Sequence, residues 1–250
     1  MQAGRYVFTS LDAKTALGVS DAATKLALHR LRLKGEIASP GRGFYIIVPP
    51  EYRTLGCLPA DQFIPALMAH LQLPYYAGLL SAAQYHGAAH HRPQEFQVML
   101  GKPRKPIECG RVRIAFHVRK RIADVPVMSL NTPRGTIAVS TPAATAFDLV
   151  GYESRIGGLD AVATLLVELA EKLDPKDLAS LIPIVPLPWV QRLGYLLERI
   201  DEAPRARFLK KHVQAHAHDT AILQPALPVA HCPRDPNWKL IINTEVEAET

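Results

Sequence analysis

The sequence predicts an α+β protein, with an N-terminal winged helix-turn-helix domain followed by a larger C-terminal domain of mixed α/β structure. Three observations lead to this prediction. Two short amphipathic helices are expected at residues 11–17 and 20–34, and two strand-like runs follow them. A strand that alternates basic and apolar residues is expected at residues 111–119. Helical patterns fill most of residues 141–217.

The two N-terminal helices are separated by a short turn. Gly18 ends the first helix, because glycine readily adopts the left-handed conformation found at helix C-termini. Ser20 is a good N-cap for the second helix, which runs to about Lys34. At about 100° per residue, four side chains of the second helix fall on one face and form its expected buried stripe. They are Thr24, Ala27, Leu28 and Leu31.

The strand-like runs at residues 36–39 and 44–48 are joined by a Pro-Gly-Arg-Gly turn, so they form a hairpin with a cationic tip. A helix with a polar outer face beside a basic hairpin is typical of proteins that enter a DNA groove and contact phosphates. The alternatives are a solvated helix face and a winged domain that binds only protein. The candidate DNA-binding residues are Ser20, Ala22, Lys25, His29, Arg30, Arg32, Lys34 and Arg42.

Composition limits the class of protein. A chain of 250 residues that is 48% hydrophobic can form two domains with real cores, and two prolines near residue 50 predict a boundary between residues 1–50 and 51–250. The net charge of +6 favours polyanionic partners. Three scattered cysteines without metal-ligand spacing suit reduced thiols, and neither a signal peptide nor a membrane-spanning run is visible. We therefore expect a cytoplasmic protein that does not bind membranes.

The C-terminal domain is expected to combine helices and strands. Thr141 as N-cap and Pro142 in the first turn predict a helix that extends to residue 150. Other periodicities predict helices at residues 61–71, 75–85, 159–173, 175–181, 189–200 and 203–217, and strands at residues 95–100, 136–139 and 239–243.

A basic segment is the second notable feature of the chain. Between residues 102 and 121, eight basic side chains stand against a single acidic one, so this segment alone carries a charge of +7. Its second half predicts a half-buried strand with an apolar inner side and a basic outer ladder. Such a ladder suits a phosphate backbone or an acidic protein, and the alternative is a solubilising face on an exposed strand. The candidate surface residues are Lys102, Arg104, Lys105, Arg111, Arg113, Arg119, Lys120 and Arg121.

The sequence holds no recognisable catalytic motif. It lacks a phosphate-binding Gly-x-x-x-x-Gly-Lys-Ser/Thr loop and a Gly-x-Ser-x-Gly nucleophile elbow. Two groups of histidines have no acidic or cysteine ligands at suitable spacing, so a polar surface or helix-end role is expected rather than a metal site. They are His86, His90 and His91, and His212, His216 and His218. We expect neither an enzyme nor a cofactor.

Two longer blocks resemble a known family. Residues 76–86 read Tyr-Ala-Gly-Leu-Leu-Ser-Ala-Ala-Gln-Tyr-His, and residues 140–150 read Ser-Thr-Pro-Ala-Ala-Thr-Ala-Phe-Asp-Leu-Val. In their order with the winged helix and the basic strand, they resemble the AbiEi-type antitoxins of type IV toxin–antitoxin and abortive-infection phage-defence systems. The resemblance covers most of the chain. It implies a bacterial repressor that binds inverted repeats upstream of its own operon, with a C-terminal antitoxin domain that counters a toxin of the nucleotidyltransferase class.

The chain departs from this family at its N-terminus. Family members usually have a full helix before the helix-turn-helix pair, whereas here residues 1–10 precede it and residues 5–9 look strand-like. A winged domain without that helix has a thin core. The apolar residues that would replace this helix in the core are expected from residues 6–8, from a second subunit, or from the rest of the chain. Exposed Leu26 and Leu33 would suit the second or the third of these.

Two functions remain open at this point. In the first, the chain is a DNA-binding antitoxin and autorepressor, acting as a possible homodimer on a two-fold operator. In the second, it is a protein-interaction module that regulates a partner enzyme through the basic strand, with little or no DNA binding. DNA, RNA and protein all remain candidate partners of the basic strand.

Overall fold

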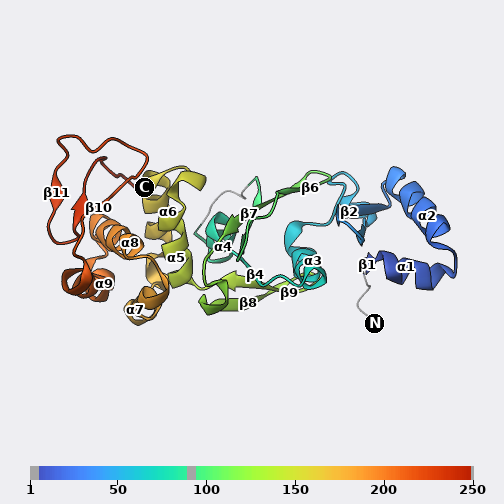
Figure 1. The fold of residues 1–250 in the computed structure, drawn as a ribbon, viewed down its shortest axis with the longest axis horizontal. Helices are drawn as coiled ribbons and strands as arrows, with labels where there is room; N and C mark the ends of the chain where they lie inside the picture. The colour runs from blue at the N-terminus through green and yellow to red at the C-terminus, as the bar shows by residue number, and fades with distance from the viewer. Residues whose placement is uncertain (1–5, 89–93, 249–250) are drawn as a thin grey trace. The chain divides into compact units, whose positions relative to one another are not determined.

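The structure is a computed structural model, and it describes residues 6–88 and 94–248 of the chain (Figure 1). The described residues divide into two compact units. Unit 1 contains residues 6–77, 94–122 and 129–138, and unit 2 contains residues 78–88, 123–128 and 139–248. The architecture is α+β, with a small N-terminal α/β region and a larger region built on a mixed sheet and helices, which confirms the predicted fold class at this level.

The N-terminal α/β region begins unit 1. It consists of β1 (Val7–Thr9), α1 (Ser10–Leu17), α2 (Asp21–Leu33), β2 (Ile37–Gly41) and β3 (Phe44–Ile47). The strands form an antiparallel sheet in the order β1-β3-β2, and Val7 pairs with Ile46. The predicted helix pair and hairpin are therefore confirmed, and the strand-like residues before them do form a strand.

Local sequence rules explain the ends of the two helices. Gly18 takes the left-handed conformation at φ 64°, and the Ser20 hydroxyl accepts a hydrogen bond from the Ala23 amide, as predicted. The start of α1 was not anticipated. Thr9 is its N-cap and forms a reciprocal capping box with Asp12, which places the helix start directly after β1.

The small region is covered in two of the three expected ways. Among its described residues, its own core contains only Ala13, Leu28 and Ile37 as buried apolar residues, and Phe8 packs on this core while stacking on Tyr45. The β2–β3 hairpin, by contrast, shares a larger core with the sheet of unit 1, against which Tyr6 and Val7 also pack. Cover from residues 6–8 and from the rest of the chain is thus confirmed, while a second subunit stays a prediction.

A six-stranded mixed sheet accounts for most of the remainder of unit 1. Its order is β6-β7-β5-β4-β9-β8, with β5 and β7 parallel and with β4–β5 and β6–β7 antiparallel. The helix α3 (Ile64–Leu71) precedes it and contributes Leu67 and Met68 to the core. The strands are β4 (Tyr75–Ala77), β5 (Phe96–Leu100), β6 (Ile107–Cys109), β7 (Val112–Val118), β8 (Val127–Thr132) and β9 (Gly135–Ser140).

The predicted helix over residues 75–85 is wrong in its first part. Residues 75–77 form β4, in which Tyr76 is buried and pairs with Met99 of β5, and the helix α4 spans only Leu79–Tyr85. Gly78 has an extended backbone and Leu79 a positive φ of 53°, so the chain turns sharply between strand and helix. Pairing with a strand more than twenty residues away overrode the helical pattern.

Unit 2 is mainly helical, as predicted. After α4 it contains α5 (Pro142–Gly151), α6 (Leu159–Leu169), α7 (Pro175–Leu181), α8 (Leu187–Arg199) and α9 (Ala203–His216). Thr141 caps α5 through its hydroxyl, with Pro142 in the first turn, as expected. A small sheet in the order β10-β12-β11 completes the unit, with strands Ala221–Ile222, Leu240–Ile241 and Arg234–Asp235.

A buried amide connects α8 to the C-terminal segment of unit 2. Gln191 donates hydrogen bonds from its Nε2 to the carbonyls of Trp238 and Lys239, at 3.1 and 2.9 Å. In the described parts of the chain, every helix is too short or too polar to cross a membrane.

Candidate nucleic-acid interface

The helix α2 has one buried and one exposed face. Thr24 and Leu28 are buried and Ala27 and Leu31 are half-buried, which confirms the predicted inner stripe. The opposite face is solvent-exposed and carries most of the candidate DNA-binding residues. All eight candidates are exposed: Ser20, Ala22, Lys25, His29, Arg30, Arg32, Lys34 and Arg42.

The basic side chains of this face are available for an external partner. Within the described residues, the side chains of Lys25, Arg30, Arg32 and Lys34 make no ion pair or hydrogen bond with the protein. Lys14 behaves differently, because it pairs with Asp21 at 2.7 Å and thereby lowers the pKa of the Asp21 carboxyl. The acidic residue at the start of α2 is therefore neutralised locally, and the exposed face of the helix is left cationic.

The β2–β3 hairpin holds Arg42 at its tip. Gly43 follows Arg42 with a φ of 74°, and the Ser39 hydroxyl donates to the carbonyls of Gly41 and Phe44, each at 3.1 Å. Ala38, Phe44 and Ile46 are buried in the unit 1 core. The tip is thus anchored by a rigid base, and the Arg42 side chain extends into solvent.

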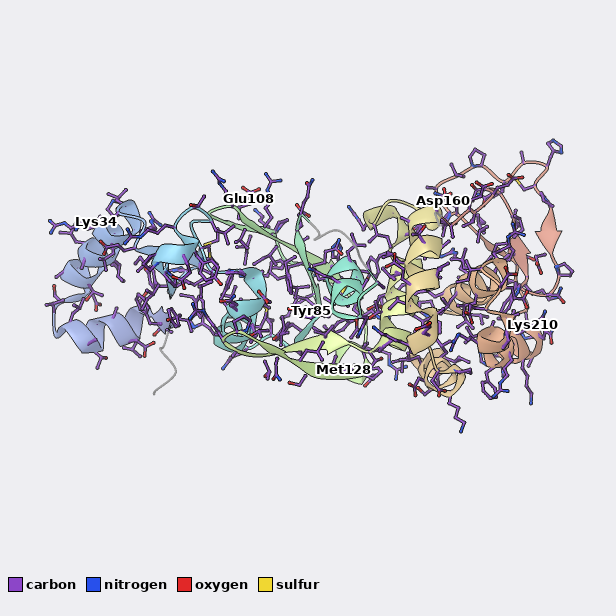
Figure 2. The ribbon with its side chains drawn as sticks, turned by 180° about the vertical axis from the view of Figure 1, so that it is seen from behind. Lys34, Tyr85, Glu108, Met128, Asp160 and Lys210 are labelled. Atoms are coloured by element: carbon purple, nitrogen blue, oxygen red, sulfur yellow. The ribbon has the colours of Figure 1, made fainter. Side chains whose placement is uncertain are left out.

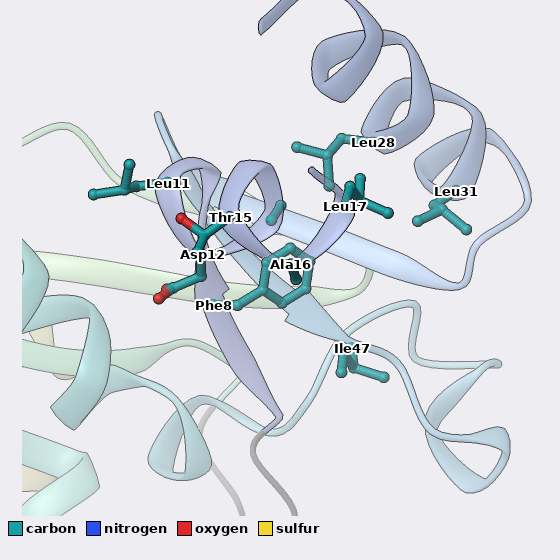
Figure 3. A pocket seen from close by; sticks show the side chains of 10 residues that line it. Phe8, Leu11, Asp12, Thr15, Ala16, Leu17, Leu28, Leu31 and Ile47 are labelled. Carbon is teal, nitrogen blue, oxygen red and sulfur yellow. The ribbon is translucent and has the colours of Figure 1, made fainter. Parts of the chain in front are cut away.

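An apolar groove of about 690 Å³ lies on the other side of the helix pair (Figure 3). It is lined by residues of β1, α1, α2 and β3, and Figure 3 shows Leu17, Leu28 and Leu31 turned toward the same space. Of the described residues that line it, Asp12 is the one that is charged, and its carboxylate accepts hydrogen bonds from the amide and the hydroxyl of Thr9. The groove contains the inner residues of α2, so it does not overlap the exposed basic face.

The basic segment forms the β6–β7 hairpin and the loops on both sides of it. Arg111 and Arg113 are exposed, while Val112 and Ile114 are buried, as the alternation predicted. Glu108 pairs with Arg113 at 3.8 Å on the surface, a type of contact that contributes little to stability. Six of the eight candidates are exposed: Lys102, Lys105, Arg111, Arg113, Lys120 and Arg121.

Two candidates of the basic segment require correction. Arg119 was expected to extend the outer ladder, but it is 4% exposed, whereas Val118 is 37% exposed. The alternation reverses because β7 ends at Val118 and the Arg119 amide donates to the Leu100 carbonyl at 2.7 Å, which draws the arginine inward. Arg104 is half-buried, with its guanidinium 5.6 Å from the centre of the Phe116 ring.

The β6–β7 hairpin lies beside the β2–β3 hairpin within unit 1. The Arg111 amide donates to the Leu55 carbonyl at 2.8 Å, and residues of both hairpins share one core. Figure 2 shows Lys34, at the end of α2, and Glu108, on β6, along the same edge of this unit. The β6–β7 hairpin, which carries exposed Arg111 and Arg113, is therefore in direct contact with the hairpin that carries Arg42.

Two cysteines that are far apart in sequence meet in this core. Cys57 and Cys109 are both buried, and a hydrogen bond between their side chains, together with burial, raises the pKa of Cys57 above its usual value. The three cysteines are scattered along the sequence, and no local spacing signals this pair. Within the described ranges, no three metal-ligating side chains come together.

Three of the candidate histidines, His86, His212 and His216, have defined contacts in the structure. His86 is buried, and its Nε2 lies 2.7 Å from the Ser140 carbonyl oxygen, while burial lowers the pKa of the ring. His212 and His216 stack on one face of α9 with ring centres 4.2 Å apart. His90 and His91 lie outside the described residues.

Comparisons with known proteins bear on these assignments. The chain matches the fold of the RV2827C protein from Mycobacterium tuberculosis with a TM-score of 0.68 and 18% identity, over 95% of this chain and 86% of that one. A second match is to the antibiotic-resistance factor ANT(2'')-Ia, with a TM-score of 0.30 and 12% identity, over 62% of this chain and 94% of that one.

No curated protein matches the sequence. The family described as the AbiEi antitoxin C-terminal domain matches residues 76–199, a range that includes both sequence blocks on which the resemblance rested. Residues 76–199 therefore match the AbiEi antitoxin C-terminal domain family, which confirms the resemblance of the chain to the AbiEi-type antitoxins.

Proposed function

We propose that the protein is a DNA-binding antitoxin that represses its own type IV toxin–antitoxin operon and counters a toxin of the nucleotidyltransferase class. In this proposal residues 1–50 are a winged helix-turn-helix domain, with α2 as the recognition helix and the β2–β3 hairpin as the wing. Residues 51–250 are the antitoxin domain. The membership of residues 76–199 in the AbiEi antitoxin C-terminal domain family supports the antitoxin role and a cognate toxin partner.

The observation that carries the DNA-binding part is the exposed face of α2. A helix is read as a recognition helix when one face is anchored in a core and the other presents cations and small side chains to a groove. On α2, Thr24 and Leu28 anchor the helix, and Lys25, His29 and Arg30 are exposed outside this anchoring face. Arg42 on the adjacent hairpin tip supplies the phosphate contact expected of a wing.

The partner we propose is an operator duplex with inverted repeats. Two copies of the chain on such a site place their recognition helices about one helical turn apart, or a multiple of it, in successive major grooves. The exposed cations of the β6–β7 hairpin are proposed as an additional nucleic-acid or partner surface.

The apolar groove favours a second candidate function, in which the protein acts mainly by binding another protein. Open apolar surfaces rimmed by polar residues are typical of docking sites. In that case the chain regulates a partner enzyme with little or no DNA binding.

Selection of duplexes from a randomised library, followed by gel-shift titration, separates the two candidates. We expect the full chain to enrich duplexes that contain an inverted repeat. The double variant Lys25→Ala/His29→Ala should bind the enriched duplex at least about 30-fold more weakly, because loss of each contact costs about 1–3 kcal/mol.

The matched control removes a lysine and a histidine from exposed positions of unit 2. Lys211→Ala/His218→Ala should bind as tightly as the original protein. If the Lys25→Ala/His29→Ala variant also binds normally, α2 is not the recognition helix. If the full chain enriches no duplex, the DNA-binding function is wrong and the protein-binding function remains.

A further inference from the structure

The exposed face of α2 has an apolar centre. Ala22, Leu26, His29 and Leu33 follow each other at intervals of four, three and four residues, so they lie within an arc of about 60° on the helix surface. Leu26 is 51% exposed and Leu33 is 73% exposed, and both are opposite the buried stripe of Thr24 and Leu28. The two leucines are thus the large apolar side chains in the middle of an otherwise cationic face.

Basic side chains flank this stripe on both sides. At about 100° per residue, Lys25 and Arg32 lie on one side of it and Arg30 and Lys34 on the other, each about 70–110° from its centre. A helix in a major groove faces base edges along its centre and has a phosphate backbone on either side. The charge pattern of α2 fits that geometry, with lysines and arginines toward both backbones and Ala22, Leu26 and His29 toward the bases.

The side chains at the centre determine what can be read there. Bidentate hydrogen bonding to guanine uses Arg or Lys, and to adenine Asn or Gln, but the stripe contains neither, and residues 21–34 include no Asn or Gln. The feature that an aliphatic side chain recognises in the major groove is the 5-methyl group of thymine. Leu26 lies in the second turn of α2, in the N-terminal half from which recognition helices reach base edges.

We propose that Leu26, supported by Ala22, is a specificity-determining residue that contacts thymine methyl groups in the major groove. This proposal rests on the proposed DNA-binding function and adds to it the class of base that the chain selects. Leu33 lies in the last turn, farther from the base edges, and is not assigned a base contact.

The test uses the full chain and the strongest duplex that it selects from a randomised library. Each thymine of the selected site is replaced in turn by uracil, which removes only the methyl group and leaves the hydrogen-bonding edge intact. We expect one or two replacements to weaken binding about four-fold each, the equivalent of one buried methyl-sized group. Leu26→Ala should bind the thymine and uracil duplexes with affinities that differ by less than about two-fold.

Leu227→Ala is the matched control, because Leu227 is a 40% exposed leucine of unit 2 and lies outside both the stripe and the apolar groove. This variant should keep the full discrimination between thymine and uracil. If Leu26→Ala keeps it as well, or if no thymine position discriminates, the proposal is overturned while DNA binding stands. A change in oligomeric state of Leu26→Ala by light scattering, with discrimination intact, would assign the leucines to a contact between copies. If the chain selects no duplex, both this proposal and the proposed function fail.

Discussion

Gly110 lies in the turn between β6 and β7, where its backbone comes close to an earlier loop of the chain. It has a φ of 60°, and a Cβ at this position would lie 2.3 Å from the Leu55 carbonyl oxygen. The caps at Gly18, Ser20 and Thr141 were predictable because each depends on residues within one helical turn. The role of Gly110 depends on a loop more than fifty residues earlier, as does the contact of Cys109 with Cys57, so neither has a local signal.

Replacing Gly110 by alanine should destabilise unit 1 more than the same change at Gly18. Both glycines have a left-handed backbone, with φ of 60° and 64°, so the conformational cost of about 1–2 kcal/mol is shared. Gly18 has no atom within 4 Å of the added Cβ, whereas Gly110 meets the backbone of Leu55 and Gly56. Overpacking adds about 1–3 kcal/mol, so Gly110→Ala should lose at least about 1 kcal/mol more in urea unfolding. If the two variants lose the same free energy of unfolding, the loop at Leu55 moves aside for the added Cβ without an energetic cost.

At the scale of elements, the β8–β9 turn connects the N-terminal strand to the sheet of unit 1. Arg134 lies in this turn, and its guanidinium is 3.5 Å from the centre of the Tyr6 ring just before β1. Its Nε donates to the Gln62 side chain at 2.7 Å, and Glu51 lies 3.6 Å from the same guanidinium. The Arg134 side chain is 17% exposed, so these contacts are largely shielded from water.

Arg134→Ala should loosen β1 from β3. The variant loses a charged hydrogen bond and a cation–π contact, together about 2–4 kcal/mol, in a region whose own core is small. Hydrogen exchange should accelerate at the Ile47 amide, which donates to the Tyr6 carbonyl at 2.8 Å. Arg53→Ala removes an exposed arginine from the same unit and serves as the control. Unchanged exchange at Ile47 in Arg134→Ala would show that strand pairing alone holds β1 in place.

The sequence predicted those elements in which apolar residues recur at the spacing of a helix or a strand. The helices α2 and α5 and the strand β7 were found from the spacing of apolar residues together with caps. The strand β4 was assigned to a helix because it is defined by pairing with the distant strand β5. The edge strands β6 and β8 were missed because β6 has only three residues and β8 is exposed along most of its length, so neither shows a clear apolar alternation. The candidate interface was predictable on α2 for the same reason, whereas the inward turn of Arg119 depends on its hydrogen bond to Leu100.

At the scale of the whole molecule, the distribution of charge matters more than the net value. The chain has a net charge of +6, yet residues 102–121 alone carry +7. Arg119 is buried and Arg104 is half-buried, so the remaining exposed cations of this segment lie on or near the β6–β7 hairpin. Because that hairpin shares a core with the β2–β3 hairpin, its arginines are expected to act together with α2 on an extended polyanion.

The salt dependence of DNA binding should therefore report more contacts than the helix and wing alone provide. Five cations, Lys25, Arg30, Arg32, Lys34 and Arg42, predict a slope of log affinity against log salt of about −4.5, at about 0.9 per phosphate. We expect a steeper slope for the full chain, reduced by about one in Arg42→Ala and by about two in Arg111→Ala/Arg113→Ala. Arg155→Ala/Lys211→Ala, which removes two exposed cations of unit 2, should leave the slope unchanged. A normal slope in Arg111→Ala/Arg113→Ala would place the β6–β7 hairpin away from DNA and leave its arginines for an acidic protein partner.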